Sequence, residues 1–591
     1  LETLDYSRMF LTRSDVEMLR GSYGSELQDY VQLGNPAPIY DIYDIFKQRV
    51  RERVNFVKQL LKRNYTFESD ETFTLDRSQA PWPQDEAAAD RLWRKRIKSE
   101  LLRAKLSEIS DEPGNERVLK RYNQLLHRIE SRTRNDIIYD FLASLARVYD
   151  PHSEYLDPDD LDNFEISMRL SLVGIGAVLR SEDGYAQIVE LVPGGPAERQ
   201  GDLGVNDKIA GVAQGQREFV DVVDMELDEV VKMIRGEKGT TVRLLVMPAK
   251  AVDPSQKKVV SIVRDKVELK QQEAKAEVIE RLGPDGEPEK LGWITLPSFY
   301  ADMGKSRTSR NSKSTTRDVA ILLERLKKEK IEGLVVDLRA NGGGSLEEAV
   351  NLTGLFIEDG PVVQAKDTQG NITISRDRDP RVAYDGPMVV LTSRLSASAS
   401  EIFAGALQDY NRAVIVGDSS TFGKGTVQTM LDIGRFMAPV NGEDPNAGAL
   451  KLTIQQFYRP SGQSTQLRGV VSDIILPTLT DLKDIGEPSL DGPLPYDEVD
   501  PLRIDKFAEQ SLYLDKLRKR SQARVMQSRE FQYVLEDIAR LERKKEANVI
   551  SLNEERRRAE IAREEARDER RLAEREAREM PEPVVYEITL D

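Results

Sequence analysis

The sequence predicts an α/β protein in which a largely parallel sheet follows a smaller strand-rich unit, with helical regions at both ends of the chain. Apolar runs at 292–300, 333–339, 387–393 and 413–418 have the composition of strands that are buried on both faces. Amphipathic helical patterns such as 398–410 lie between these runs, and this alternation is typical of a parallel sheet. Ligands of such sheets bind at the carboxyl ends of the strands.

Four regions follow one another along the chain. Residues 1–168 carry apolar residues at spacings of three and four, which indicates packing helices. Residues 169–252 change to short strands, glycine turns and one helix, and residues 253–480 contain the sheet. Residues 481–591 become helical again and end in a highly charged tail, in which acids and bases alternate at helical spacing. This alternation favours one exposed helix held by ion pairs over a partner-binding helix.

The composition excludes several kinds of protein. The 591 residues include 86 Lys and Arg against 102 Asp and Glu, and the net charge of −16 argues against nucleic-acid binding and against docking on an anionic membrane surface. The chain has no cysteine, which excludes disulfides, thiolate metal sites and thiol catalysis. The sequence contains no run of about 18 apolar residues, so we expect no transmembrane helix. The first residues, LETLDYSRMF, lack the pattern of a signal peptide, so either none exists or it has been removed.

The tract SASAS at 396–400 follows an apolar strand and opens a helix. It offers three candidate nucleophiles, Ser396, Ser398 and Ser400, and spacing alone does not choose among them. Ser398 and Glu401 also have the spacing of a capping box, so the tract can be explained as a well-capped helix start. A nucleophile is compatible with the same geometry, because the helix N-terminus stabilises developing negative charge.

Lys424 lies between two glycines in FGKGT, after another apolar strand. A lysine can activate a serine hydroxyl when burial lowers its pKa by several units from the usual value of about 10.4. Competing bases are few, because the chain has only two histidines. If 424–430 is extended, Gln428 shares a face with Lys424 and can orient its amine. These features predict a serine hydrolase with a Ser/Lys pair.

Two glycine loops offer backbone amides as binding groups. NGGG at 341–344 follows the strand at 333–339, where it can be a plain turn or can form an oxyanion hole. GIGA at 174–177 precedes a strand of the smaller unit, where consecutive N–H groups can capture the carboxylate of a peptide C-terminus. For this second pattern taken alone, a plain turn is the better supported interpretation.

Seven segments taken in order resemble the tail-specific, or C-terminal processing, serine proteases, in particular their long bacterial periplasmic branch. The segments are RSQAPWPQDE, DPHSEYLDP, SLVGIGAVL, GGPAERQGDLGVNDKI, LRANGGGS, SASASEIFAGALQDY and TFGKGTVQ. The resemblance implies a crotonase-like protease core over 253–480, a PDZ domain inserted at 169–252, and helical domains at 1–168 and 481–591.

The resemblance also assigns roles to individual residues. It implies that Ser398 is the nucleophile and Lys424 the general base, with Gln428 as the third member of the catalytic set. The oxyanion hole maps onto the backbone amides of Ala399 and Gly344. In the PDZ domain the carboxylate-binding loop and the groove map onto Ile175, Gly176, Ala177, Leu227 and Val231, with Val230 as groove or packing surface. Asp409 matches a position tied to activity in relatives, and we interpret it as structural support.

The function that the resemblance implies is ATP-independent cleavage of proteins recognised by an apolar C-terminal tail. Substrates would include cell-envelope or cell-wall enzymes in the periplasm, an adaptor protein could take part, and no metal, cofactor or nucleic acid is implied. Two alternatives stay open. A catalytically silent PDZ scaffold or chaperone would bind tails without cutting them, and a crotonase-fold acyl-CoA enzyme would bind acyl-CoA.

Overall fold

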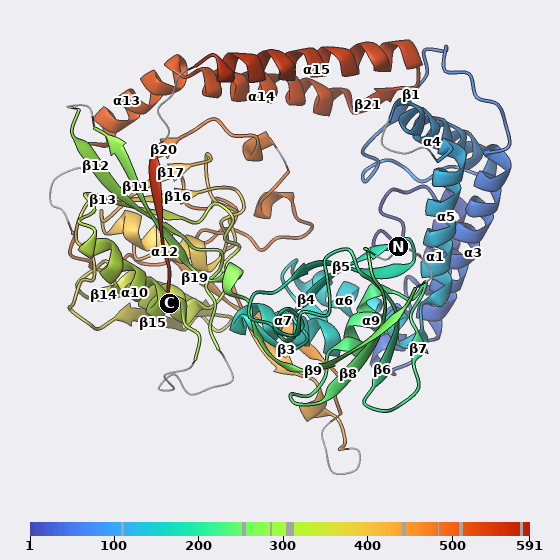
Figure 1. The fold of residues 1–591 in the computed structure, drawn as a ribbon, viewed down its shortest axis with the longest axis horizontal. Coiled ribbons are helices and arrows are strands. Elements are labelled where there is room, and N and C mark those ends of the chain that lie inside the picture. Colours follow the sequence, from blue (N-terminus) through green and yellow to red (C-terminus); the bar gives the residue numbers. More distant parts are fainter. Residues whose placement is uncertain are drawn as a thin grey trace.

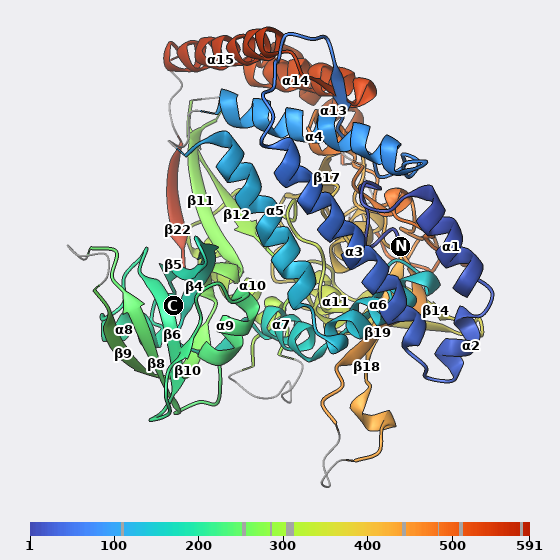
Figure 2. The ribbon, with the colours of Figure 1, turned by 90° about the vertical axis from the view of Figure 1, so that its right-hand side faces the viewer.

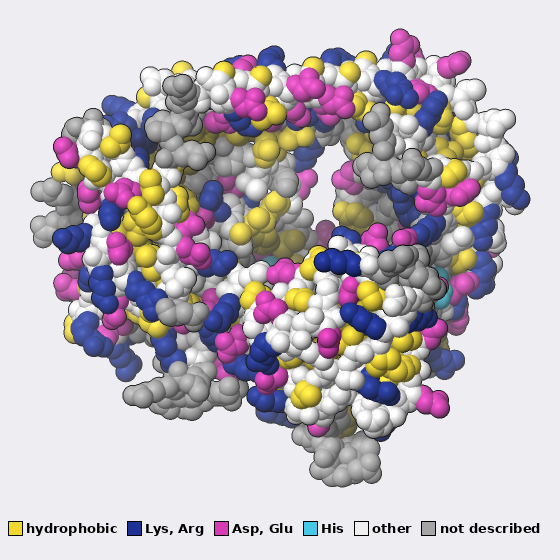
Figure 3. Space-filling model, viewed as in Figure 1, with side chains coloured by type: hydrophobic (Ala, Val, Ile, Leu, Met, Phe, Trp, Pro, Cys, Tyr) yellow, Lys and Arg dark blue, Asp and Glu magenta, His cyan; other side chains and the backbone are white. Residues whose placement is uncertain are grey.

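The computed structural model describes residues 1–107, 112–250, 256–283, 286–302, 312–439, 445–482, 484–507, 512–578 and 583–590. The described elements are arranged as a ring (Figure 1). The N-terminal helices form one side, the smaller strand-rich unit lies below, the sheet forms the opposite side, and C-terminal helices bridge the top. The space-filling view shows an opening through this ring (Figure 3).

The N-terminal region is mainly helical and has its own hydrophobic core. The helices are α1 (Arg13–Tyr23), α2 (Leu27–Gln32), α3 (Ala37–Leu60), α4 (Glu86–Leu106), α5 (Gly114–Ser131) and α6 (Arg134–Tyr149). On α3 the spacing of Val50, Val54 and Val57 places all three on one face, and all three are buried. Capping boxes at Thr12 and Thr133 fix the starts of α1 and α6.

The smaller unit is an antiparallel sheet with its own core. Its strands run in the order β4-β5-β6-β8-β9, with β7 (Val220–Asp221) beside β6 and helices α8 (Pro196–Gln200) and α9 (Leu227–Ile234). The strands are β4 (Ala177–Glu182), β5 (Tyr185–Leu191), β6 (Lys208–Gln214), β8 (Thr241–Met247) and β9 (Lys258–Val263). The unit is joined to the rest by α7 (Pro158–Arg169) and by the antiparallel pair β3 (Ser171–Gly174) and β10 (Asp265–Glu268).

The central sheet has the strand order β20-β17-β16-β13-β12-β11-β22. The strands are β11 (Lys275–Leu282), β12 (Pro288–Thr295), β13 (Gly333–Asp337), β16 (Met388–Thr392), β17 (Val414–Gly417), β20 (Ile474–Ile475) and β22 (Val584–Ile588). From β12 to β20 neighbouring strands are parallel, which confirms the predicted parallel sheet, and β11 pairs antiparallel with both of its neighbours. Helices α10 (Thr315–Lys328), α11 (Leu346–Gly354) and α12 (Ala399–Asp409) contribute to the same core.

A second, antiparallel sheet carries the segment after Lys424. Its order is β15-β14-β19-β18, and the short strand β2 (Glu154–Leu156) also pairs with β19. The strands are β14 (Gly360–Asp367), β15 (Ile372–Asp377), β18 (Thr426–Asp432) and β19 (Ala449–Tyr458). The turn after β18, which includes the 3-10 helix Gly434–Phe436, projects from the body (Figure 2). The extended conformation predicted after Lys424 is confirmed by β18.

The end regions are mainly helical but not all-α, so that part of the sequence prediction needs correction. After α13 (Leu514–Gln527) and α14 (Arg529–Ala547), strand β21 (Val549–Ser551) pairs with β1 (Thr72–Thr74) of the N-terminal region. Helix α15 (Glu554–Glu576) then returns to the other side of the ring, where β22 joins β11. Strands of three to five residues carry too little periodicity to be recognised in a sequence.

Candidate active site

The predicted catalytic loops meet at the carboxyl edge of the parallel strands. NGGG follows β13, the serine tract follows β16, and the lysine loop follows β17, and these three strands are adjacent in the sheet. The loops contact one another directly. The amide of Ala397 donates to the Asn341 carbonyl (3.2 Å), and the amide of Phe422 donates to the Ser396 carbonyl (3.0 Å).

The structure distinguishes the three serines of the tract. The hydroxyls of Ser396 and Ser400 are fully buried and donate to the carbonyls of Leu338 (2.7 Å) and Asn341 (2.9 Å). Ser398 is only partly buried and occupies the N-cap of α12 with φ 57° and ψ −114°. Positive φ is uncommon for a residue with a side chain, and such strain concentrates at functional positions. Ser398 is therefore the candidate nucleophile.

Glu401 fixes both the serine and the lysine backbone. Its side chain is fully buried, and one carboxylate oxygen accepts the amides of Ser398 (2.8 Å) and Lys424 (2.9 Å). The other oxygen accepts the Thr421 hydroxyl (2.6 Å) and the Gly423 amide (2.7 Å). Burial raises the pKa of Glu401 to about 7, against the effect of these four donors. The sequence offered only a capping-box signal for this residue.

Lys424 has the environment that a general base requires. Its Nζ donates to Gln428 Oε1 at 2.6 Å, and burial lowers its pKa to about 8, with a further contribution from the nearby positive charge of Lys451. A lysine with this pKa has a substantial neutral fraction near neutral pH. The amide of Gln428 is itself held, because its Nε2 donates to the hydroxyls of Thr426 and Thr453, each at 2.9 Å.

The glycine loop packs against the turn at Ser398. A Cβ added to Gly343 would lie 2.9 Å from the Ser398 Cβ and 3.2 Å from the Ala399 nitrogen. The amide of Gly343 donates to the Asn341 side chain (2.9 Å), whereas the amides of Gly344 and Ala399 have no acceptor among the residues that the structure describes. Gly344 has φ +140°, and a Cβ there would lie 2.3 Å from the Phe299 carbonyl oxygen, so only glycine fits. Two uncommitted amides beside a serine can hold an oxyanion.

The residues predicted to bind a peptide tail lie just before β4, at the start of β4 and on α9 of the smaller unit. Strand β4, which begins at Ala177, is an edge strand, and α9 lies against it. Within the described chain the amides of Ile175 and Gly176 have no acceptor, and Gly176 has φ +75°. On α9, Leu227 and Val231 are partly exposed, whereas Val230 is buried and packs in the core of the unit. An edge strand with free amides at one end can accept an extended C-terminus.

Asp409 lies at the far end of α12 and makes structural contacts. Its carboxylate forms an ion pair with Arg459 and accepts the amide of Ser461 at 3.0 Å. These contacts join the end of α12 to the loop after β19. They agree with structural support rather than direct chemistry.

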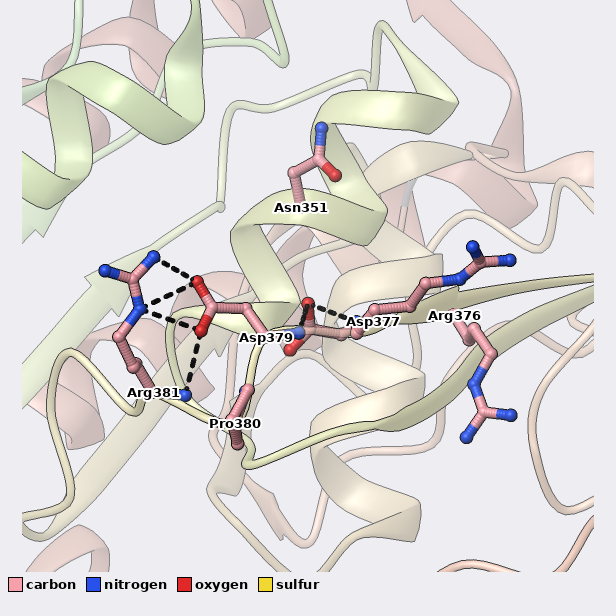
Figure 4. Close-up of a pocket in the computed structure, with 7 residues that line it drawn as sticks. Asn351, Arg376, Asp377, Asp379, Pro380 and Arg381 are labelled. Carbon is pink, nitrogen blue, oxygen red and sulfur yellow. Dashed lines mark hydrogen bonds and ion pairs between the residues drawn. The ribbon is translucent and has the colours of Figure 1, made fainter.

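A separate hollow is lined by Asn351 and residues 376–381 (Figure 4). Arg381 pairs with Asp379, and the Asp377 carboxylate accepts the amides of Arg378 and Asp379. Since none of the predicted site residues lines this hollow, we assign it no part in the chemistry. Over the described part of the chain, His, Asp and Glu side chains form no metal-binding group of three, and no helix has the length and hydropathy needed to span a membrane.

Family models match nearly the whole chain in four consecutive parts. They are the tail specific protease N-terminal domain at 1–159, the PDZ domain at 164–247, peptidase family S41 at 290–476, and the C-terminal domain of tail specific protease at 480–590.

Individual proteins show the same similarity. The chain is 38% identical to the tail-specific protease of Haemophilus influenzae, over 98% of this chain and 80% of that protein. It is 28% identical to the carboxy-terminal-processing protease of Bartonella bacilliformis, over 62% of this chain and 77% of that protein. Among solved structures, a photosystem II D1 C-terminal processing protease is 26% identical, covering 61% of this chain and 89% of its own, with a TM-score of 0.33. A peptide-bound PDZ domain of a carboxy-terminal protease from Vibrio cholerae is 51% identical, covering 17% of this chain and 100% of its own, with a TM-score of 0.16.

Proposed function

Because this chain belongs to the tail-specific serine proteases of peptidase family S41, we propose that it is an ATP-independent endopeptidase in which Lys424 activates Ser398. The observation that carries this proposal is the Glu401 carboxylate oxygen that accepts the amides of both residues, which places their backbones side by side. The lowered pKa of Lys424 supports the role of a base.

The proposed chemistry follows from this arrangement on a crotonase-like core. Neutral Lys424 takes the proton of the Ser398 hydroxyl as Oγ forms a bond to the scissile carbonyl carbon. The amides of Ala399 and Gly344 stabilise the resulting oxyanion. When the C–N bond breaks, the Lys424 ammonium gives its proton to the leaving amine, and an ester to Ser398 remains. Lys424 then deprotonates a water molecule that hydrolyses this ester and restores Ser398.

We further propose that the PDZ domain selects substrates by an apolar C-terminal tail. The uncommitted amides of Ile175 and Gly176 support binding of the terminal carboxylate, and Leu227 and Val231 supply apolar groove surface. Substrates of this kind include partly unfolded proteins of the cell envelope. A periplasmic location and a contribution from an adaptor protein are parts of the same proposal.

A paired reporter tests this function directly. An unstable protein with an apolar C-terminal tail is expected to be degraded by the wild-type chain, whereas the same protein with a charged tail is expected to be spared. Cleavage is followed by gel and tail binding by fluorescence anisotropy. Tail binding without cleavage by the wild type would instead support a scaffold, and equal cleavage of both reporters would contradict tail selection.

The pH dependence of cleavage tests the role of Lys424. In the wild type kcat/KM is expected to rise with pH up to about 8 and then to level off, because the neutral amine is the active form. Replacing Lys451 with methionine removes a positive charge that disfavours the protonated amine, so the pKa of Lys424 rises and the acidic limb of the profile moves to higher pH. An exposed lysine of α13 provides the control, and Lys519→Met is expected to leave the profile unchanged. Superimposable profiles for Lys451→Met and wild type would contradict the assignment of the limb to Lys424.

A further inference from the structure

The segment Asp150-Pro-His-Ser153 reaches the surroundings of Lys424 from a distant part of the chain. It follows α6 and precedes β2, and the side chains of Asp150 and Ser153 are buried (1% and 0% exposed). The sequence motif that contains it supported the family resemblance, but no step of the proposed chemistry uses it. Its contacts show what it can do.

Asp150 is hydrogen-bonded to Lys424 through two intermediate side chains. The Thr453 hydroxyl contacts Asp150 Oδ1 at 2.9 Å, and Gln428 Nε2 donates to the same hydroxyl oxygen at 2.9 Å. Gln428 Oε1 accepts Lys424 Nζ at 2.6 Å. The Asp150 carboxylate also accepts the amide of His152 and the hydroxyl of Ser153, so it is held in place from its own loop.

The hydrogen bonds that connect Asp150 to Lys424 can be donated in only one direction. A carboxylate only accepts, so the single proton of the Thr453 hydroxyl points to Asp150. The Thr453 oxygen can then only accept from Gln428, which turns the amide nitrogen of Gln428 toward Thr453 and its oxygen toward Lys424. Asp150 thus fixes which end of the Gln428 amide faces the lysine.

The orientation of that amide decides whether Lys424 can act as a base. With the amide oxygen facing it, the neutral amine donates an N–H to Gln428 and keeps its lone pair for the Ser398 proton. With the amide reversed, Nε2 would donate to that lone pair and compete with Ser398. We propose that Asp150 is a positioning residue that keeps the Lys424 lone pair available for the Ser398 proton by fixing the orientation of the Gln428 amide through Thr453. This inference rests on the proposed function of Lys424.

A second series of hydrogen bonds connects the same segment to the lysine loop. His152 Nε2 contacts Glu487 Oε2 at 2.6 Å, and the other Glu487 oxygen accepts Gln466 Nε2 at 2.8 Å. Gln466 Oε1 then accepts the amide of Gly425, the residue after Lys424, at 2.8 Å. In both series of hydrogen bonds a buried carboxylate orients a glutamine side chain, so that the amide oxygen of the glutamine faces the lysine loop. The segment therefore constrains the lysine at its side chain and at its backbone.

Steady-state cleavage of the apolar-tail reporter tests the proposal. Asp150→Ala frees the Thr453 hydroxyl, and kcat is expected to fall about 10- to 100-fold with KM changed less than about twofold. Thr453→Val, which removes the hydroxyl, is expected to show a similar fall, whereas Thr453→Ser, which keeps it, is expected to retain most of the activity. In a Gln428→Ala background, Asp150→Ala is expected to have no further effect, because both changes act through the same amide.

Controls separate this proposal from its alternatives. Asp15 is another buried aspartate, paired with Arg49 in the N-terminal region, and Asp15→Ala is expected to lower the Tm without changing kcat of the folded enzyme. Cleavage by wild type but not by Lys424→Ala establishes the proposed function independently. With that established, wild-type kcat in Asp150→Ala, or multiplicative effects of Asp150→Ala and Gln428→Ala, would overturn the positioning role. If Asp150→Ala does not fold, equal kcat of Thr453→Val and Thr453→Ser overturns it.

Discussion

Replacing Lys424 with methionine is expected to lower kcat for reporter cleavage by about 10²–10⁴-fold, the usual contribution of a general base. Methionine retains an unbranched side chain of similar length but cannot take the Ser398 proton. Binding of the C-terminal tail is expected to be unchanged, because β4 and α9 belong to a unit with a separate sheet and its own core. Single-turnover cleavage and tail-binding anisotropy measure the two properties separately.

Stability provides the control for this substitution. Burial lowers the pKa of Lys424 to about 8, so the folded protein disfavours the charged amine, and this destabilisation is complete below pH 8 and disappears as pH rises toward the unfolded-state value near 10.5. Methionine removes the charge, which offsets the loss of the hydrogen bond to Gln428. The Tm of Lys424→Met at pH 7 is therefore expected to equal or exceed that of the wild type. Retention of more than a tenth of wild-type kcat in a folded variant would exclude Lys424 as the base.

Glu401→Gln is expected to abolish cleavage and to destabilise the protease core by about 3 kcal/mol or more. All four partners of the carboxylate are donors, namely the Thr421 hydroxyl and the amides of Ser398, Gly423 and Lys424. An amide NH₂ in place of one oxygen leaves two of these donors facing another donor, and each buried group left without a partner costs about 1–3 kcal/mol. The turn at Ser398 and the lysine loop would lose their common support.

Chemical denaturation measures the loss of stability, and the apolar-tail reporter measures the loss of activity. Glu324→Gln on the exposed face of α10 makes the same chemical change outside the site and is expected to alter neither. Wild-type activity in Glu401→Gln would show that the shared oxygen does not hold the two loops. If Glu401→Gln is stable but inactive, Glu401 organises the active site without contributing to the stability of the core.

The sequence predicted the elements that have strong periodicity or apolar runs. The parallel strands, the helix after Ser398 and the extended segment after Lys424 all follow from local patterns. Local spacing did not choose among the three serines, and Ser398 was named only through the family resemblance. The structure separates the three by showing which hydroxyls donate to carbonyls of another loop. The capping-box spacing accounted for Glu401 in the sequence. Nothing further in the sequence indicated that its carboxylate also contacts the lysine loop.

Contacts between distant segments could not be predicted from local patterns. The hydrogen bond between Asp150 and Thr453 joins residues 303 positions apart, and neither residue type is unusual where it stands. The pairing of β22 with β11 was missed for a related reason. Five residues at the end of a charged region, four of them exposed, indicate neither a strand nor the sheet that it joins.

Two strand pairs close the ring: β21 pairs with β1, and β22 pairs with β11. Beside the first pair, the amide of Asp76 donates to the side chain of Asn548, 472 positions away in sequence. Strand β22 completes the edge of the sheet that carries the catalytic loops. Contacts of such long range form late, because the entropy of closing a large loop opposes them. The catalytic sheet keeps an open edge until residues 584–588 pair with β11, so the finished ring requires segments from both helical end regions.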